Sequence, residues 1–331
     1  MKLLMKYAKR VKNELDELIL KTLIGKPKEL YEASAHLLKA GGKRLRPILL
    51  LAVAKGYGLE EFKAMPAAAA IELLHNFTLV HDDIMDRDTF RRNVPTVHSI
   101  WGEALAILAG DLLFSKAFEV LLMLEDRGIN HELIVKAAKK LSWASITVAE
   151  GQALDMEFEK RFDVTEEEYF IMIEKKTAAL FKIAAEIGAI IAGADDEEVY
   201  NIGEYARHMG IAFQIRDDIL GIIADESKLG KPILSDIREG KRTILVIHTL
   251  SKLTNEEKKK FLSILGNRNA RMEELKYAAQ LIKDSGAIEY AEFKARTYVN
   301  KSIEYLNRTN IMKEVYEMLR ELAEYIVLRE K

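Results

Sequence analysis

The sequence predicts an all-α protein built as a bundle of long helices. Apolar residues recur at spacings of three and four along almost the whole chain, whereas the alternation typical of strands is nearly absent. Only five prolines interrupt the 331 residues, and no stretch rich in proline, serine and glycine separates two parts. Because 49% of the residues are hydrophobic, one large core can form, and we expect residues 1–331 to be a single helical domain.

Interruptions of the apolar pattern set the bounds of the expected helices. Two glycines stand at 41–42, and residues 88–95 contain two adjacent arginines and a proline. Residues 225–240 form the longest expected loop, which is rich in charge and glycine. In chain order, the expected helices are 2–22, 27–39, 45–56, 62–86, 97–124, 131–157, 166–192, 196–222, 241–250, 255–264, 271–284, 287–306 and 310–329.

Composition excludes several classes of protein. Lys and Arg number 50 against 52 Asp and Glu, a net charge of −2, so we expect no general nucleic-acid binding. Cysteine is absent, which excludes disulfides and thiolate metal sites. The amphipathic N-terminus lacks the apolar core of a signal peptide, and no run of 18 uncharged apolar residues predicts a transmembrane segment. We expect a cytoplasmic protein.

Two aspartate pairs, 135 residues apart, each follow an apolar helical stretch and are the most informative feature of the chain. The first lies in HDDIMD and contributes Asp82, Asp83 and Asp86; the second lies in FQIRDD and contributes Asp217 and Asp218. The first aspartates could simply be acids at a helix end exposed to water. The helix dipole, however, disfavours acids at a C-terminal end, so a bound cation is the simplest compensation. Clustered carboxylates without His or Cys favour Mg²⁺, and several Mg²⁺ ions in one cavity suit a diphosphate.

Cations follow or precede these acids. Arg91 and Arg92 are consecutive on an expected loop, and each guanidinium can hold phosphate oxygens through paired donors. Salt bridges to nearby aspartates within that loop are the alternative. Upstream, GGKRLRP places Lys43 and Arg46 after two glycines. This segment lacks the spacing of a phosphate-binding P-loop, and it is either a second anion site or a solvent-facing turn.

Three further segments indicate a functional site only when they are considered together. Asp155 lies late on an expected helix, and Lys176 and Thr177 lie inside another. The loop after the second aspartates holds Lys231 and, further on, Lys241. A basic loop opposite a metal cluster could close over a diphosphate and exclude water.

Taken in order, these segments resemble the trans-isoprenyl diphosphate synthases. The resemblance rests on GGKRLRP, HDDIMD with RRNVPT, GQALD, KKTAAL, FQIRDD and GKP followed by EGKRT, and it extends from Gly41 to Lys241. It implies one large bundle of long antiparallel helices around a central cavity, and a homodimer. It also implies that an allylic diphosphate ionises with the help of Mg²⁺ and is attacked by isopentenyl diphosphate.

The resemblance also implies a role for each matched residue. Main metal ligands would be Asp82, Asp86 and Asp217, supported by Asp83 and Asp218. The allylic diphosphate would contact Arg91, Lys176, Lys231 and Lys241. Isopentenyl diphosphate would contact Lys43, Arg46, His75 and Arg92. Thr177 and Gln214 would place oxygen dipoles near the carbocation, and Asp155 would orient the lysines.

One position departs from the family pattern. Many members carry Asp-Asp-x-x-Asp as the second motif, whereas this chain has Gly221 in the fifth position. Asp225 follows four residues later and is not assumed to replace it. The departure puts the role of Asp218 in doubt more than that of Asp217.

Product length is expected to depend on the helix that ends with the first aspartates. Phe77, Thr78 and then Leu74 would face the growing chain, and one helical turn of ~5.4 Å is about one isoprene unit. A floor at Phe77 resembles short-chain synthases that make geranylgeranyl diphosphate. Alternatives are farnesyl diphosphate as the main product, a terpene cyclase, or a non-catalytic partner subunit.

Overall fold

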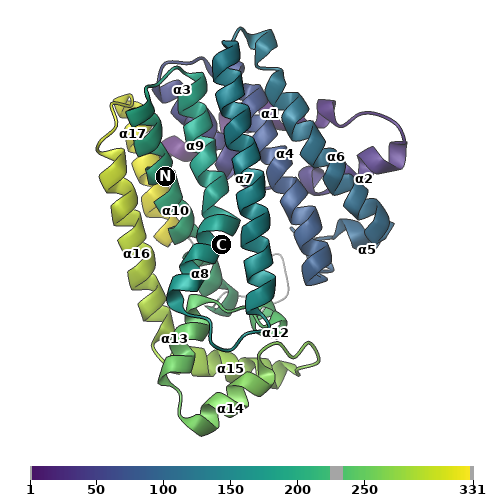
Figure 1. The fold of residues 1–331 in the computed structure, drawn as a ribbon, viewed down its shortest axis with the longest axis vertical. Helices are drawn as coiled ribbons and strands as arrows, with labels where there is room; N and C mark the ends of the chain where they lie inside the picture. The colour runs from purple at the N-terminus through teal and green to yellow at the C-terminus, as the bar shows by residue number, and fades with distance from the viewer. Residues whose placement is uncertain (1, 224–233, 329–331) are drawn as a thin grey trace.

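The computed structural model describes residues 2–223 and 234–328 and confirms the all-α prediction. Figure 1 shows long helices lying side by side along the longest dimension of the molecule. The first half contains α1 (Lys2–Thr22), α2 (Lys28–Lys39), α3 (Leu45–Gly56), α4 (Glu61–Asp86), β1 (Phe90–Arg91), β2 (Val94–Pro95), α5 (Val97–Trp101), α6 (Glu103–Leu122), η1 (Glu125–Arg127) and α7 (His131–Phe158). The second half contains α8 (Glu166–Ile173), η2 (Glu174–Ala178), α9 (Ala179–Ile191), α10 (Asp196–Ile223), α12 (Ser235–Glu239), α13 (Ile244–Lys252), α14 (Asn255–Ile264), α15 (Met272–Asp284), α16 (Ala287–Leu306) and α17 (Lys313–Leu328).

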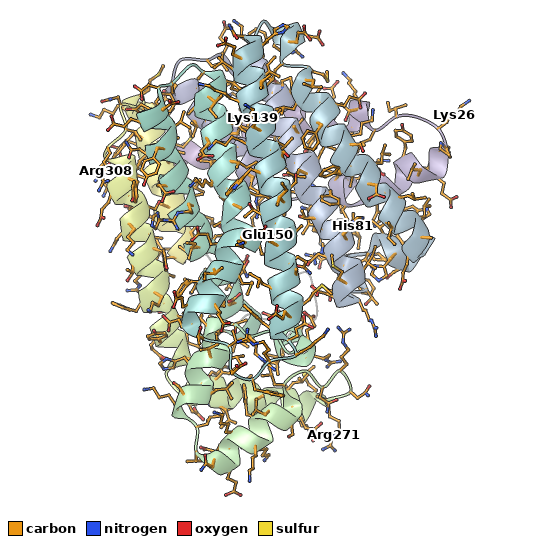
Figure 2. All side chains as sticks on the ribbon, in the orientation of Figure 1. Lys26, His81, Lys139, Glu150, Arg271 and Arg308 are labelled. Carbon is orange, nitrogen blue, oxygen red and sulfur yellow. The ribbon has the colours of Figure 1, made fainter. Side chains whose placement is uncertain are left out.

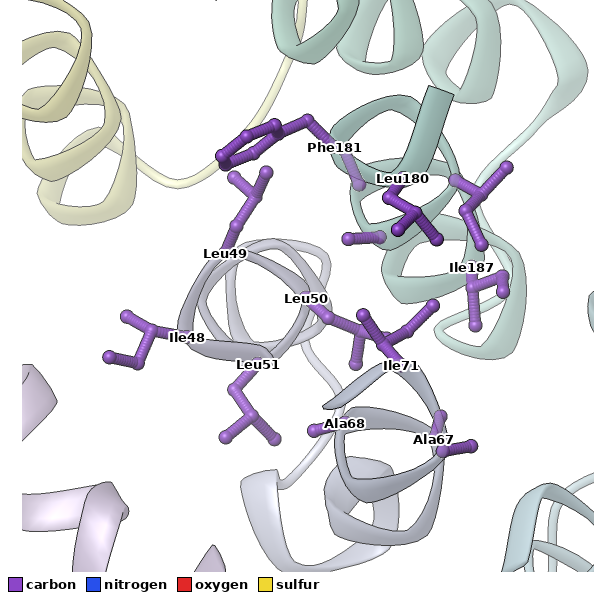
Figure 3. Close-up of a cluster of buried hydrophobic side chains, with 14 of the residues drawn as sticks. Ile48, Leu49, Leu50, Leu51, Ala67, Ala68, Ile71, Leu180, Phe181 and Ile187 are labelled. Atoms are coloured by element: carbon purple, nitrogen blue, oxygen red, sulfur yellow. The ribbon is translucent and has the colours of Figure 1, made fainter. Parts of the chain in front are cut away.

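The main core forms around two helices that are apolar on all sides. Helix α3 is buried from Pro47 to Ala54, and α9 buries every side chain except Lys182. Such all-round apolarity is typical of a helix in the middle of a bundle. Figure 3 shows side chains of α3, α4 and α9 converging there, with Leu50 beside Ile71. These helices therefore form the rigid frame that carries the site residues at their ends.

A second core lies at the lower end of the molecule in Figure 1, where α13, α14 and α15 gather beneath α8, α10 and α16. Phe261, Leu275 and Ile282 are fully buried there. Ile237 of α12 joins this core, also with no exposed surface. The second core thus fixes the segment that follows the second aspartate pair.

A tight hairpin follows α4. Arg92 and Asn93, between β1 and β2, have φ of 54° and 62°, the left-handed pair that suits two-residue hairpin turns. After the turn, Arg91 contacts Asp83 of α4, whereas Arg92 donates a hydrogen bond to the carbonyl of Leu37 in α2. Backbone geometry therefore explains why two adjacent arginines reach two different places.

The helix predictions are confirmed with three corrections. The expected helix 97–124 is broken at Gly102, whose φ of 81° places it outside the helical region. The expected helix 166–192 contains one turn of π-helix, η2, which carries Lys176 and Thr177. Such π turns are frequent at functional sites. Within the loop expected at 225–240, the described part forms the short helix α12.

Charged side chains cover the outside of the bundle. Figure 2 shows Lys139, Glu150, Arg271 and Arg308 on its surface, and all four are exposed. Among the described helices, none has the length and apolarity needed to cross a membrane.

Candidate active site

A cavity of about 890 Å³ opens between α4, α6, α7, η2 and α10. Its polar end is lined by Arg46, His75, Asp82, Arg91, Arg92, Lys176, Thr177, Gln214 and Asp217. Its other walls are mainly apolar. Predicted site residues from both halves of the chain, among them Asp82 and Asp217, thus line one cavity.

A smaller cavity of about 180 Å³ adjoins the first and shares Asp82, Arg91, Lys176, Thr177 and Gln214 with it. Seven carboxylates line the small cavity, from Asp82, Asp86, Asp88, Asp155, Asp218, Asp236 and Glu239, together with four cations, from Arg91, Lys176, Lys241 and Arg242. Because the acids outnumber the bases, the cavity favours additional positive charge.

Two lysines bridge the carboxylates of separate helices. The Lys176 ammonium lies 2.7 Å from Asp155 Oδ2 and 3.3 Å from Asp82 Oδ1. The Lys241 ammonium lies 2.9 Å from both Asp86 Oδ1 and Asp155 Oδ2, and 2.7 Å from Glu159 Oε1. Asp155 is therefore the carboxylate that both lysines contact, and its role in orienting them remains a prediction.

Asp155, Lys176 and Lys241 shift one another's pKa values. Burial tends to raise the pKa of Asp155, but Lys176 and Lys241 outweigh it and lower that pKa to about 2. Burial tends to lower the pKa of each lysine, but the neighbouring carboxylates raise both. Both ammonium groups consequently stay charged at neutral pH and can meet an anionic ligand.

The first aspartates face different surroundings although they occupy the last turns of α4. Asp82 lines both cavities, and its buried Oδ1 accepts no hydrogen bond. Asp83 is fully buried and paired with Arg91. Burial raises the pKa of Asp83 to about 7, although Arg91 opposes the shift. Asp82 and Asp86 thus line the small cavity, whereas Asp83 lines neither cavity and pairs with Arg91. Their roles as metal ligands remain predictions.

The second pair divides in a similar way. Asp217 is half-buried and lines the large cavity. Asp218 is buried and accepts hydrogen bonds from Tyr169 Oη at 2.6 Å and Gln214 Nε2 at 2.8 Å. In turn, Gln214 Oε1 accepts a hydrogen bond of 2.7 Å from Thr177 Oγ1. Asp218 thus anchors the two oxygen-bearing side chains expected near a carbocation.

A second group of basic side chains also lines the polar end of the large cavity. Arg46, His75 and Arg92 line the cavity together, and Arg46 Nη1 lies 3.2 Å from His75 Nε2. Burial and the neighbouring Arg46 lower the pKa of His75 well below its usual value. A neutral imidazole accepting this bond at Nε2 carries its proton on Nδ1. These three side chains form a basic pocket. Asp217 is the one acid of α10 that lines the same cavity.

The apolar part of the cavity ends at aromatic rings. Phe77 packs edge to face against Phe114, with centroids 5.2 Å apart, and Phe114 packs similarly against Phe118. Phe77, Thr78 and Phe114 line the cavity, whereas Leu74 is fully buried in the core beneath them. The rings thus lie at the apolar wall of the cavity, and their role as a floor that limits product length remains a prediction.

Comparisons with known proteins agree with this geometry. Residues 27–282 match the family described as polyprenyl synthetase. This chain belongs to the polyprenyl synthetase family. It is 48% identical to a geranylgeranyl diphosphate synthase of Sulfolobus acidocaldarius, covering 98% of each chain, and 46% identical to a geranylfarnesyl diphosphate synthase of Aeropyrum pernix, covering 96% and 99%.

A solved structure supports the same assignment. The fold is similar to that of a geranylgeranyl pyrophosphate synthetase from Pyrococcus horikoshii, with a TM-score of 0.91, 43% identity and 99% of each chain covered. As a polyprenyl synthetase, the chain is a prenyltransferase of isoprenoid biosynthesis. The family resemblance and the all-α fold expected from the sequence are thereby confirmed.

The residues of this polyprenyl synthetase fit the divalent metal that the family uses. Asp82 Oδ1 is buried without a hydrogen bond, and the surrounding cavity has more acids than bases. Among residues 2–223 and 234–328, no three carboxylates or histidines already lie at the spacing that holds an ion. Lys176 and Lys241 lie between the acids, so side chains must shift when an ion binds.

One predicted contact residue lines neither cavity, and another is outside the part of the chain that the structure describes. Lys43 is exposed in the loop before α3 and does not line the large cavity. Lys231 lies outside the described residues. The proposed contacts of both remain predictions.

Sequence reasoning missed the network that holds the basic pocket. Glu72 is buried in the apolar stretch of α4, and its Oε1 accepts bonds from Arg44 at 2.7 Å and from Asn76 at 3.0 Å. Asn76 Oδ1 lies 3.4 Å from Arg92. Glu72 thereby ties the glycine-containing loop before α3 to the hairpin after α4. A lone acid inside an apolar helix was the available signal.

Sequence reasoning also missed Glu159 and Tyr169, which partner Lys241 and Asp218. Neither has a sequence signal, because each meets its partner only through the packing of distant helices.

The buried Asp218 predicts a pH-dependent stability. Burial, followed by repulsion from Asp236, raises its pKa to about 8, against 3.8 for an ordinary aspartate. Folding therefore favours the protonated carboxyl, and this stabilisation is present below about pH 4 and is lost as the pH rises toward 8. We predict that Asp218→Asn raises the free energy of unfolding of metal-free protein by roughly 2–5 kcal/mol more at pH 9 than at pH 5.

Unfolding in guanidinium chloride with a chelator present measures this difference. Asp284→Asn, an exposed change of the same kind on α15, serves as the control and should show no such pH dependence. An effect of Asp218→Asn that is equal at both pH values would contradict the assignment.

Proposed function

We propose that this prenyltransferase condenses isopentenyl diphosphate head to tail with dimethylallyl, geranyl and farnesyl diphosphates, giving mainly geranylgeranyl diphosphate. One observation supports the proposal: the polar end of a single cavity is lined by Asp82, Asp217, Arg91 and Lys176 as well as by Arg46, His75 and Arg92, and its other walls are mainly apolar. Two anion-binding regions are needed because each reaction brings together two diphosphates. An apolar compartment is needed because the product tail grows by one isoprene unit each time.

The allylic diphosphate is proposed to bind at the aspartate side. Asp82, Asp86 and Asp217 would hold Mg²⁺ ions, which neutralise the diphosphate and stabilise the charge that grows on it as it leaves. Arg91, Lys176 and Lys241 would contact its oxygens directly, and Lys231 is retained from the sequence prediction. These cations already lie against the acids, so they are held in position before the substrate arrives.

Side chains of the protein would then stabilise the carbocation and shield it from water. When the C–O bond of the allylic diphosphate breaks, Thr177 Oγ1 and Gln214 Oε1 present negative dipoles at the border of the two cavities. Asp218 keeps Gln214 in place through its 2.8 Å hydrogen bond. The apolar walls exclude water that would quench the cation. The double bond of isopentenyl diphosphate forms the new C–C bond, and a proton leaves to the departed diphosphate.

Isopentenyl diphosphate is proposed to bind in the basic pocket. Arg46, His75 and Arg92 line it, and Lys43 is retained from the sequence prediction. Burial lowers the pKa of Arg46 to about 10, so its guanidinium is still charged at neutral pH. His75 contributes a neutral imidazole, which can donate one hydrogen bond from Nδ1. This pocket needs no metal, in contrast to the aspartate side.

We also propose that two copies of the chain associate through α6 and α7. Leu108 and Leu122 of α6 and Val135, Trp143 and Ile146 of α7 expose large apolar side chains, each with at least 45% of its surface accessible. Apolar side chains gathered on neighbouring helices are typical of a protein interface. A second copy of the same surface is the proposed partner.

Product analysis tests the proposed reaction. Isopentenyl diphosphate supplied with dimethylallyl, geranyl or farnesyl diphosphate should give mainly the twenty-carbon diphosphate, and a chelator should abolish turnover. Chromatography of the dephosphorylated products measures the chain length. Consumption of farnesyl diphosphate alone would indicate a terpene cyclase instead. No turnover by the purified chain would favour a non-catalytic subunit.

Removing the aromatic floor should lengthen the product. In Phe77→Ala, the ring that packs against Phe114 is lost, and the cavity can extend toward Leu74 by about one helical turn, the length of roughly one isoprene unit. We predict that products of twenty-five carbons or more become prominent. Phe62→Ala, an exposed position on the same helix, is the control and should leave the distribution unchanged. An unaltered product length in Phe77→Ala would place the floor elsewhere.

A further inference from the structure

The π turn η2, which carries Lys176 and Thr177, is wider than the helical turns on either side of it. The Ala179 N–H donates a hydrogen bond to the carbonyl of Glu174, five residues earlier, whereas an α-helix bonds four residues back. The extra residue in the turn enlarges the backbone at this point of the helix. The helices that pack against η2 must therefore leave room for its backbone.

Gly151 leaves this room on α7. A Cβ atom built on Gly151 would lie 2.3 Å from the backbone nitrogen of Lys176 and 2.7 Å from its Cα atom. Backbone atoms cannot turn aside as the end of a flexible side chain can, so no larger residue fits at position 151 unless the π turn moves. Four residues later, on the same face of α7, Asp155 accepts the 2.7 Å hydrogen bond from the Lys176 ammonium.

Gly210 repeats the arrangement on α10. A Cβ atom built on Gly210 would lie 2.7 Å from the Cα atom of Ala178 and 3.0 Å from its Cβ atom. Four residues later, Gln214 accepts the 2.7 Å hydrogen bond from Thr177 Oγ1. Each of the two helices thus brings one glycine against the backbone of the π turn. One helical turn further on, each helix also brings one polar side chain that bonds to a side chain of the π turn.

The depth at which the π turn lies between α7 and α10 sets the positions of its two polar side chains. Ordinary Cβ contacts begin at 3.4 Å, so alanine in place of Gly151 requires the two backbones to part by about 1 Å. A shift of this size is large against the 2.7 Å hydrogen bonds that Lys176 and Thr177 make. In enzymes, misplacing a reacting group by about 1 Å can cost roughly 100-fold in rate.

We propose that Gly151 and Gly210 are positioning residues, which seat the π turn at the depth where Lys176 and Thr177 reach the cavity and their hydrogen-bond partners together. Neither glycine lines either cavity, so each acts only through the turn. The inference rests on the proposed function for what the two side chains do in the reaction. The seating itself is a packing relation between η2 and its two neighbouring helices.

Steady-state kinetics with isopentenyl and dimethylallyl diphosphates tests the positioning. Gly151→Ala should lower kcat by about 100-fold, because Lys176 and Thr177 are displaced. The KM for isopentenyl diphosphate should change by less than about twofold, because its proposed pocket is built by α3, α4 and the hairpin. An unchanged kcat in Gly151→Ala would overturn the inference.

Gly188→Ala on α9 is the matched control. A Cβ atom built on Gly188 would lie 2.6 Å from the carbonyl oxygen of Leu50, a contact about as tight as that of Gly151. Position 188 lies in the core, about 18 Å further along the same helix from Lys176. Gly188→Ala should therefore lower Tm as Gly151→Ala does, yet leave kcat within about twofold of wild type. Equal losses of kcat in the two variants would show a merely structural role and overturn the inference.

Deletion of Lys175 provides a second test, which also serves if Gly151→Ala does not fold. Removing one residue from a single π turn leaves an α-helical turn, whose narrower backbone no longer needs the glycine. In the deletion background, Gly151→Ala should lower Tm much less than in the wild-type background, or should fold only there. An equal loss of Tm in both backgrounds, or a double variant that does not fold, would overturn the inference.

The thermal melts separate this inference from the proposed function, because they do not depend on any reaction. A wild-type chain that forms no prenyl product would contradict the proposed function, and the melts would still show whether Gly151 makes room for the π turn. A wild-type chain that forms product, together with melts that show no coupling between Gly151→Ala and the deletion, would overturn the inference alone.

Discussion

The candidate active site depends on two ammonium groups that neutralise carboxylates from separate helices. Lys176 and Lys241 contact Asp82 and Asp86 at the end of α4 and Asp155 near the end of α7. A unit charge pair 4 Å apart contributes roughly 4 kcal/mol at an effective dielectric constant near 20, against about 1 kcal/mol in water. Without these lysines, the acids would repel one another across the cavity, and the helix ends could not approach so closely.

The same arrangement prepares the site for its substrate. Cations that already lie against acids need little further ordering when a diphosphate enters, and preorganised charges give most of their stabilisation at the step where charge develops. The lysines also explain why the carboxylates do not yet stand at metal-binding spacing in the described residues. Under the proposed function, an incoming diphosphate would offer the ammonium groups new partners, and the acids would then be available to metal ions.

Much of this could be predicted from the sequence because the features are local. Helical spacing located the frame, and the clustering of Asp82, Asp83 and Asp86 within five residues was enough to indicate a cation site. The sequence could not predict which aspartate of each pair lines the large cavity and which is buried. Asp83 and Asp218 differ from Asp82 and Asp217 only in what packs around them.

Long-range partners were equally hidden from the sequence. Glu72 meets Arg44 across 28 residues, and Tyr169 meets Asp218 across 49. Asp236 fills the space beside Gly221 only because the second core holds α12 against α10. Such contacts arise from how helices pack, which a pattern read along one chain does not specify. The departure at position 221 was visible in the sequence, but its consequence required the fold.

A crystal structure of the enzyme with Mg²⁺ and a non-reactive thio analogue of the allylic diphosphate tests the central claim most directly. We predict metal ions bound to Asp82, Asp86 and Asp217 across the two adjoining cavities, with the Lys176 and Lys241 ammonium groups moved from the carboxylates onto diphosphate oxygens. Metal ions bound elsewhere, or a diphosphate that leaves both lysines paired only with the acids, would contradict it.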